Sequence, residues 1–318
     1  MKFTKLLVAL LTAAAFSACD TTMTNTNRVA NTNANPANTN ASPAVQNLAV
    51  VERPQNIRDM MAARGEQDEA RPTIQILEPK TDSTIGSSTV NVRLNISGDL
   101  KGYKPMMDMA TKMGNHIHLI LDNQPYEAYY NLDGEFELRN VADGEHTLRV
   151  FPSRPWHESY KNGGAFRMVR FTVKNGGADA GKPATTSSGQ TMSNSNAAAK
   201  PTPESKDMQN STAGAVDPKQ PLLTYSRPKG EYKGTDADAI MIDFWLANAN
   251  LAGDGGQYRV RYSIDGGEAK FIDKWQPIWL SGWTNGKHNI KLELVDMDGR
   301  LIENGGYNST TKEITVAK

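Results

Sequence analysis

The sequence has a single cysteine, Cys19, among its 318 residues. A disulfide framework within one chain is therefore excluded, and the folded parts must be stabilised by burying apolar cores, which domains of about 100 residues can do. The sequence also lacks an excess of either charge, because 35 basic and 35 acidic side chains cancel. Without a basic excess, we expect no binding to nucleic acid.

A long apolar run is missing near the start of the chain. The stretch from Leu6 to Phe16 has eleven residues, whereas a membrane-spanning helix needs about 20. It follows Lys2 and Lys5 and precedes a small pair at 17–18, which is the order of basic, apolar and small residues in secretory signals. We therefore expect residues 1–18 to be a signal peptide that is removed on export.

The one cysteine directly follows this signal. Ser17, Ala18 and Cys19 resemble the lipobox of bacterial lipoproteins, in which the cysteine thiol is acylated. The resemblance implies that the exported chain is anchored to a lipid bilayer through Cys19 and faces the periplasm or the cell surface. Cleavage by the ordinary signal peptidase, for instance after Ser17, is the alternative.

Two segments lack the apolar periodicity of folded elements. Residues 20–42 are almost wholly Thr, Asn, Ala and Pro, and residues 175–218 are rich in Gly, Ala, Ser, Thr, Pro and Asn. Such compositions cannot bury enough apolar surface to offset the entropy of ordering. We expect 19–54 to be a disordered tether and 175–218 a disordered linker, so that the flanking domains are tethered and not rigidly docked.

The remaining chain is typical of short β-strands separated by Asn-Gly, Asp-Gly and Gly-Gly turns. An exception is 55–71, where Ile57, Met60 and Met61 share one helical face and predict a short helical lead-in. In the first half, the expected strands are Thr73–Glu78, Val90–Ile96, Ile117–Leu121, Phe136–Val141, His146–Phe151 and Phe166–Val173. In the second half, they are Leu222–Ser226, Ala239–Trp245, Tyr258–Ile264, Ile278–Ser281, His288–Leu294 and Thr311–Val316.

This strand pattern predicts an all-β fold. We expect two tandem immunoglobulin-like or fibronectin-III-like β-sandwiches, at 72–174 and 219–318, joined and preceded by the disordered linkers. The two halves also align with each other: Ile117–Asp122 matches Val260–Asp265, and Asp143–Leu148 matches Asn285–Ile290, with intervals that agree to within a residue. The alignment indicates a tandem duplication.

Two segments of the first half are more specific. Gly114–Asn123 and Phe151–Lys161 together resemble a family of uncharacterised bacterial lipoproteins with immunoglobulin-like domains. The resemblance covers Pro72–Val173 and supports the sandwich fold there. It implies no known activity, and the second half matches at the level of the fold alone.

Four of the five histidines lie in the first half. Strand alternation places His116 and His118 on the face opposite the core, and antiparallel pairing with His146–Phe151 brings them near the loop that follows Phe151. Imidazole with thioether suits Cu(I), and imidazole with carboxylate suits Cu(II) or Zn(II). The sequence therefore predicts a candidate copper, zinc or small-ligand site. Its candidate residues are His116, His118, His157, Glu158, Arg154, Met109 and Met113.

A structural interpretation of the same residues stays open. His116 and His118 are then solvated sheet-face residues, the methionines pack under their loop, and Arg154, His157 and Glu158 fix that loop by hydrogen bonds, with no cofactor bound. His146 and His288 follow a tight turn in both halves, and we expect both to be structural.

Catalytic motifs are incomplete. His157 begins a segment like that of zinc proteases, but Lys161 stands where the second metal-binding histidine is needed. Ser159 lies near His157 without a nucleophile elbow or a recognisable orienting group. We therefore predict no catalytic residue and no enzyme.

Three tryptophans recur around the middle strands of the second half: Trp275, Trp279 and Trp283. They are candidates for an aromatic contact with a sugar or a protein partner, and packing into the core is the alternative. Taken together, the sequence predicts a monomeric, anchored, non-catalytic binding or scaffold module for an envelope protein or glycan. The alternative function is metal binding by the histidine-bearing edge of the first domain.

Overall fold

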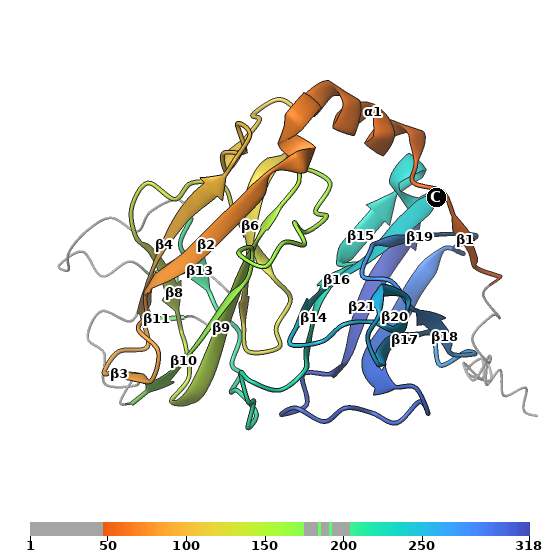
Figure 1. Cartoon of the computed structure of the whole chain (residues 1–318). Coiled ribbons are helices and arrows are strands. Elements are labelled where there is room, and N and C mark those ends of the chain that lie inside the picture. Colours follow the sequence, from red (N-terminus) through yellow and green to blue (C-terminus); the bar gives the residue numbers. More distant parts are fainter. Residues whose placement is uncertain (1–46, 175–183, 186–190, 193–203) are drawn as a thin grey trace, which may run out of the picture. The chain divides into compact units, whose positions relative to one another are not determined.

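The fold comes from a computed structural model, which describes residues 47–174, 184–185, 191–192 and 204–318. Over these ranges the chain forms two β-sandwiches (Figure 1). The one α-helix in this part of the chain is α1 (Gln55–Arg64). Short 3-10 helices occur at Gly65–Glu69, Gly234–Ala237 and Ala252–Asp254. The predicted all-β fold is confirmed.

The first sandwich has one sheet in the order β13-β8-β4-β2 and a second in the order β3-β10-β9-β6-β5, with β7 also paired to β6. The first sheet contains β2 (Arg71–Glu78), β4 (Val90–Asp99), β8 (Phe136–Arg139) and β13 (Lys206–Asp207). The second contains β3 (Ser83–Ile85), β5 (Met106–Met107), β6 (Gly114–Leu121), β7 (Glu127–Tyr129), β9 (Gly144–Ser153) and β10 (Arg167–Val173). Alternating apolar side chains meet between the sheets, where Ile74, Ile117 and Leu148 are fully buried.

The second sandwich repeats this plan with sheets in the orders β1-β19-β16-β14 and β15-β21-β20-β17-β18. The first sheet contains β1 (Ala49–Val51), β14 (Leu222–Arg227), β16 (Ala239–Ala247) and β19 (Ile278–Ser281). The second contains β15 (Gly230–Lys233), β17 (Tyr258–Ile264), β18 (Lys270–Ile272), β20 (Gly286–Asp296) and β21 (Ser309–Ala317). Phe244, Val260 and Leu292 lie fully buried in its core. Each of the twelve strands expected from the sequence is present.

The duplication extends to the hydrogen bonds of one turn. In the first sandwich His146 Nδ1 lies 2.9 Å from Asp122 Oδ2 and Nε2 lies 2.8 Å from the Ala142 carbonyl oxygen. In the second, His288 makes the same contacts with Asp265 at 2.7 Å and with the Thr284 carbonyl oxygen at 2.9 Å. Both histidines are therefore structural, as the sequence predicts.

Parts of both expected disordered segments are strands. Although 19–54 is predicted to be a tether, β1 pairs antiparallel with β19 (Figure 1). Within 175–218, β13 pairs parallel with β8, and β11 (Ala184–Thr185) pairs with β12 (Thr191–Met192). Both β1 and β13 lie at the edge of a sheet, which offers unpaired backbone hydrogen-bonding groups. Neighbouring side chains also contribute, since Leu48 is buried in the core of the second sandwich and Met208 packs against that of the first. Residues 19–46, 175–183, 186–190 and 193–203 of these two segments lie outside the described ranges.

The lead-in at 55–71 is helical as expected, with α1 followed by a 3-10 turn. Its apolar face contacts both sandwiches. Ile57 is buried in a cluster with Trp156, from the loop after β9, and with Met241 and Trp279 of the second sandwich. The helix therefore packs where the two sandwiches adjoin.

The two sandwiches are in direct contact, so the expectation that they are merely tethered is wrong. Ser159 Oγ donates a hydrogen bond of 2.8 Å to Asp243 Oδ2, and Lys161 pairs with the same carboxylate. Trp245 Nε1 donates to the Tyr160 carbonyl oxygen at 3.2 Å. Asp243 is fully buried, and a buried carboxylate requires such partners. Trp245 also packs with Phe151 and Tyr160 in an apolar cluster, so the contact is a packed interface with polar and apolar parts.

Candidate metal centre

The candidate site lies on the face of β6 that points away from the core of the first sandwich. Ile117 and Leu119 face that core, and His116 and His118 lie on the opposite face, as strand alternation predicts. Both imidazoles are fully buried, so the interpretation of solvated histidines is wrong. The second sandwich provides the cover, since His118 Nδ1 lies 3.1 Å from Oγ of Ser226 in β14.

The third histidine of the site comes from the loop after β9. Pairing of β6 with β9 sets His116 opposite Ser153 and so next to this loop. His157 has a φ of 69°, a left-handed conformation that costs a non-glycine residue about 1 kcal/mol or more. Its Nδ1 lies 2.9 Å from His116 Nε2, which is also 2.9 Å from His118 Nε2. One ring nitrogen from each histidine lies within 4.8 Å of those of the other two.

Hydrogen bonding fixes the protonation of the central imidazole. His116 Nδ1 lies 2.8 Å from the carbonyl oxygen of Gly114, which can only accept, so the proton of the neutral ring is on Nδ1 and Nε2 carries a lone pair. That lone pair faces two ring nitrogens at 2.9 Å, and it can accept a hydrogen bond from one of them. The other ring nitrogen then lies in close contact with it.

Burial keeps the cluster neutral. Desolvation lowers the pKa of His116 to about 4. It also lowers the pKa values of His118 and His157 well below their ordinary value, and the positive charge of Arg227 adds to the effect at all three rings. A neutral imidazole is the form that binds metal ions. At neutral pH the three side chains are therefore ready to act as ligands.

A cavity of about 460 Å³ adjoins the cluster through His157, which is only partly buried. Tyr126 lies between the cavity and the deeper rings: its ring stacks on His118 with centroids 3.7 Å apart, and its hydroxyl oxygen is 3.2 Å from His157 Nδ1. The other wall residues are Met107, Glu127, Ala128, Tyr130, Glu204, Lys206, Arg227, Lys229 and Gly230. The cluster thus has one side that a small ligand can approach.

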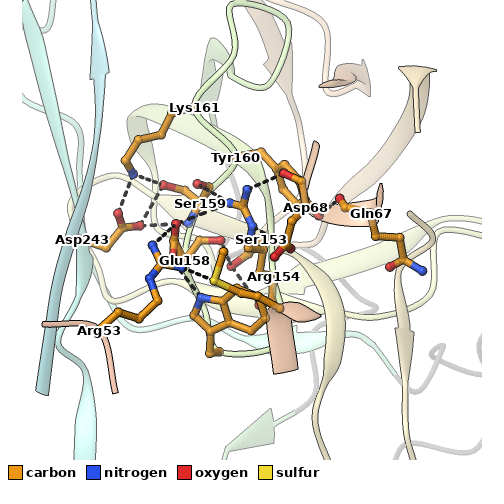
Figure 2. Close-up of polar contacts among 12 residues, drawn as sticks. Arg53, Gln67, Asp68, Ser153, Arg154, Glu158, Ser159, Tyr160, Lys161 and Asp243 are labelled. Carbon is orange, nitrogen blue, oxygen red and sulfur yellow. Dashed lines mark hydrogen bonds and ion pairs between the residues drawn. The ribbon is translucent and has the colours of Figure 1, made fainter. Parts of the chain in front are cut away.

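Arg154 and Glu158 belong to a different network, drawn in Figure 2. The Glu158 carboxylate accepts a hydrogen bond of 2.8 Å from Trp156 Nε1 and pairs with Arg53 at 3.0 Å. Arg154 pairs with Asp68 at 3.2 Å. Because their polar groups are used there, these two residues are corrected from candidate ligands to residues that fix the His157 loop. For them the structural interpretation holds.

Neither candidate methionine lines the cavity beside the cluster. The side chain of Met109 is 72% exposed, and Met113 lies at the end of a turn that the Asp108 amide closes by donating to the Met113 carbonyl oxygen at 2.7 Å. Instead Met107, which β5 holds beside β6, lines the cavity. Met109 is therefore corrected out of the ligand set, and Met107 takes the place beside the cavity that the sequence assigns to Met109 and Met113.

The three candidate tryptophans do not form one exposed stripe. Trp283 is buried in the core of the second sandwich, and Trp279 is buried on the opposite face of its sheet against Ile57. Trp275 is partly buried, and its Nε1 donates to the Phe244 carbonyl oxygen at 3.2 Å. Core packing therefore accounts for Trp283, and contact with the lead-in helix accounts for Trp279.

Sequence reasoning missed the residues that surround the histidines. Tyr126 follows β6, and Ser226, Arg227 and Lys229 come from the second sandwich. No motif marks these four residues. Because the sandwiches are predicted to be separate, nothing in the sequence directs the end of β14 to a histidine of β6.

Cys19 and the expected signal peptide at 1–18 lie outside the described part of the chain. Within that part, no helix combines the length and the apolar character needed to cross a membrane.

Comparison with known proteins adds little to the fold. No family model and no curated protein sequence matches the chain. Among solved structures, it is similar to the fibronectin(III)-like modules of CbhA from Clostridium thermocellum, with 10% identity, a TM-score of 0.24, and coverage of 77% of this chain and 94% of that chain. The D00-D0 domain of Intimin is 10% identical with a TM-score of 0.19, and the match covers 77% of this chain and 97% of that chain. The central fibronectin-III array of RIM-binding protein is 7% identical with a TM-score of 0.22, and the match covers 79% of this chain and 70% of that chain. At such TM-scores the fold assignment rests on the strand order itself.

Proposed function

We propose that this protein binds a late transition-metal ion, Zn(II) or Cu(II), through His116, His118 and His157. The observation that carries the proposal is the convergence of three ring nitrogens, all within 4.8 Å of one another, in a desolvated site. The proposal is one of metal binding and assigns no catalytic residue.

The donor set suits these two metals. Imidazole nitrogen is a good ligand for Zn(II) and Cu(II), and three histidines with one open position form a known type of zinc site. The hydrogen bond from His116 Nδ1 to the Gly114 carbonyl oxygen and the contact of His118 Nδ1 with Ser226 leave the Nε2 atoms for the metal. Neither Met109 nor Met113 lines the cavity, so thioether ligation by these two residues is not part of the proposal.

Calorimetric titration of the purified protein with Zn(II), and separately with Cu(II), tests this proposal. The experiment uses a Cys19→Ser background, so that the one thiol contributes nothing. We expect one equivalent of metal per chain, and a His116→Gln, His118→Gln variant is expected to weaken binding more than about 100-fold. The matched control is Arg259→Gln, Arg261→Gln, which changes the duplicated positions in the second sandwich. Absence of stoichiometric binding, or equal binding by the histidine variant, contradicts the proposal.

The location of the protein in the cell is a second part of the proposal. The residues before Cys19 support export and acylation, which would tether the metal site to a bacterial membrane facing the periplasm or the cell surface. Mass spectrometry of the protein from a bacterial membrane fraction tests this. We expect an acylated N-terminal peptide beginning at Cys19 and a soluble protein after Cys19→Ser. Recovery of an unmodified thiol contradicts the anchor.

A second candidate function is glycan binding, which one cavity favours. A cavity of about 800 Å³ is lined by partly buried aromatic rings, Phe166, Tyr258 and Trp275, together with the amide side chains of Asn248 and Gln257. Aromatic faces stack on sugars, and amides bond to hydroxyl groups. Affinity electrophoresis in gels containing cell-wall polysaccharide tests it: we expect retardation that Trp275→Ala abolishes and Trp275→Phe retains. Equal mobility with and without polysaccharide contradicts this function.

A further inference from the structure

The cavity beside His157 carries an unbalanced positive charge. Lys206, Arg227 and Lys229 line it, against the two carboxylates of Glu127 and Glu204. Lys229 Nζ donates to the carbonyl oxygen of Tyr126 and lies 4.3 Å from the centroid of its ring. Binding of a divalent cation at the three neutral imidazoles would add two further positive charges at this end of the cavity.

Arg227 has hydrogen-bond partners in the described part of the chain but no acidic one. Its Nη1 donates to the Lys229 carbonyl oxygen and to the Tyr232 hydroxyl, each at 3.2 Å. Its Nε is buried and makes no hydrogen bond. Across the described ranges no carboxylate lies within ion-pair distance of this guanidinium. The guanidinium is partly buried, and its planar set of donors matches a carboxylate.

Arg227 also lies close to the metal site. Its guanidinium carbon is 5.3 Å from the ring centroid of Tyr126, the ring that stacks on His118 and contacts His157. A divalent cation held by these histidines would repel the positive charge of the guanidinium. An anion between the metal and the guanidinium converts this repulsion into two attractions.

We propose that the cavity binds a small carboxylate anion that completes the coordination of the metal at His116, His118 and His157 and pairs with Arg227. This inference rests on the proposed function and names the ligand of its open position. The cavity of about 460 Å³ is much larger than the share of one water molecule, which is about 30 Å³. It therefore accommodates a small organic acid.

The test measures zinc affinity in the presence and absence of a coordinating anion. Zinc is titrated into the Cys19→Ser protein against a chromophoric chelator, at constant ionic strength, in sodium perchlorate or in sodium acetate. We expect acetate to tighten zinc binding by about tenfold or more, which corresponds to about 1.4 kcal/mol. In Arg227→Gln we expect the zinc Kd in acetate and the zinc Kd in perchlorate to differ by less than about twofold, which is within the error of the measurement. Arg300→Gln, which changes an exposed arginine of the second sandwich, retains the full effect.

The outcomes separate the two proposals. Equal zinc affinity in both salts overturns the anion site and leaves the metal site standing, whereas absence of zinc binding in either salt overturns both. If Arg227→Gln does not fold, Lys229→Gln replaces it, since Lys229 lines the same cavity. An acetate effect of full size in the folded charge variant contradicts the assignment of the anion to this cavity.

Discussion

The two sandwiches share a turn and differ in the sheet face beside it. His146 with Asp122, and His288 with Asp265, make the same pair of contacts, and both aspartates have a φ of 52°. The strand ladders agree as well: Leu121 pairs with Leu148 in the first sandwich as Ile264 pairs with Ile290 in the second. The duplication has therefore kept the local structure that closes the turn.

The outer faces of the duplicated strands have diverged. His116 and His118 are buried against the second sandwich, whereas their equivalents, Arg259 and Arg261, remain partly exposed. Arg259 pairs with Asp273 at 2.6 Å, and Arg261 pairs with Glu293 at 2.8 Å. One of the two equivalent faces is an interface with a histidine cluster, and the other carries charged side chains that are partly exposed. Within the first sandwich, the residues that stabilise the turn, His146 and Asp122, are therefore different from those that form the candidate site, His116 and His118.

The largest expected effect breaks the shared turn. Asp122→Ala removes a buried acceptor of His146 Nδ1, of the Thr147 amide and of Ser211 Oγ, and we expect it to lower the free energy of unfolding by about 3 kcal/mol. Asp265→Ala is the matched variant. Its carboxylate is more exposed, with 13% against 1% of the side chain accessible, and the expected loss is about 1 kcal/mol. Chemical denaturation measures both, and a reversed order contradicts the comparison.

The pH dependence of stability distinguishes the two kinds of histidine. In the metal-free protein burial lowers the pKa of His116 to about 4, so the unfolded chain takes up its proton first as the pH falls below 6.5. The contribution of His116 to stability is present above pH 6.5 and is lost toward pH 4, by about 3 kcal/mol. Denaturation between pH 7 and 4 should show this loss, and His116→Gln should reduce it. An unchanged slope in the variant contradicts the assignment.

His146 is expected to behave in the opposite way. Burial lowers the pKa of His146, but the hydrogen bond and the charge of Asp122 together raise it above its ordinary value. Its contribution to stability is therefore present in acid and is lost as the pH rises above 6.5 through the raised pKa. In an NMR titration, His146 should titrate above pH 6.5 and His116 near pH 4. The reverse order contradicts the assigned environments.

Zinc binding should stabilise the protein through the histidines of the first sandwich. This stabilisation should not depend on the arginines at the equivalent positions of the second sandwich. Zinc at a free concentration 100 times its Kd is expected to raise the free energy of unfolding by about 2.7 kcal/mol, and a chelator should reverse the effect. His116→Gln should abolish it, whereas Arg259→Gln, at the equivalent strand position, should retain it. Thermal unfolding of both variants with and without zinc measures this difference, and loss of the effect in Arg259→Gln would place the metal elsewhere.

The smallest effect concerns the exposed charges of the second sandwich. Arg259→Gln removes a pair with Asp273 whose two side chains are both solvent-accessible, and such pairs contribute less than about 1 kcal/mol. We expect a correspondingly small change in the denaturation midpoint. A loss as large as that of Asp122→Ala would mean that this face is also an interface.

Local features could be predicted from the sequence because local chemistry decides them. The strands follow from apolar alternation and turn residues, and the roles of His146 and His288 follow from their shared place after a turn. Alternation also assigned His116 and His118 to the correct face. Whether that face meets water or protein is set by the second sandwich, and no local pattern in β6 contains this information.

The missed residues have the same cause. Ser226 and Arg227 reach the site only because two sandwiches pack together, and the linker composition predicts the opposite. The sequence does not predict β1 because its apolar run, Leu48–Val51, is only four residues long, although Leu48 is buried in the core of the second sandwich. The place of Arg154 and Glu158 in the loop after β9 predicts that they belong to the site. The direction of each side chain, however, depends on Asp68 and Arg53, which are distant in the sequence.

X-ray absorption at the zinc edge tests the central claim most directly. The Cys19→Ser protein loaded with one equivalent of zinc should show a shell of light atoms at about 2.0 Å with the outer-shell scattering of three imidazole rings. The same spectrum should lose its imidazole features in His116→Gln, His118→Gln and keep them in Arg259→Gln, Arg261→Gln. A spectrum without imidazole scattering, or one that the histidine variant leaves unchanged, would contradict a metal centre built on His116, His118 and His157.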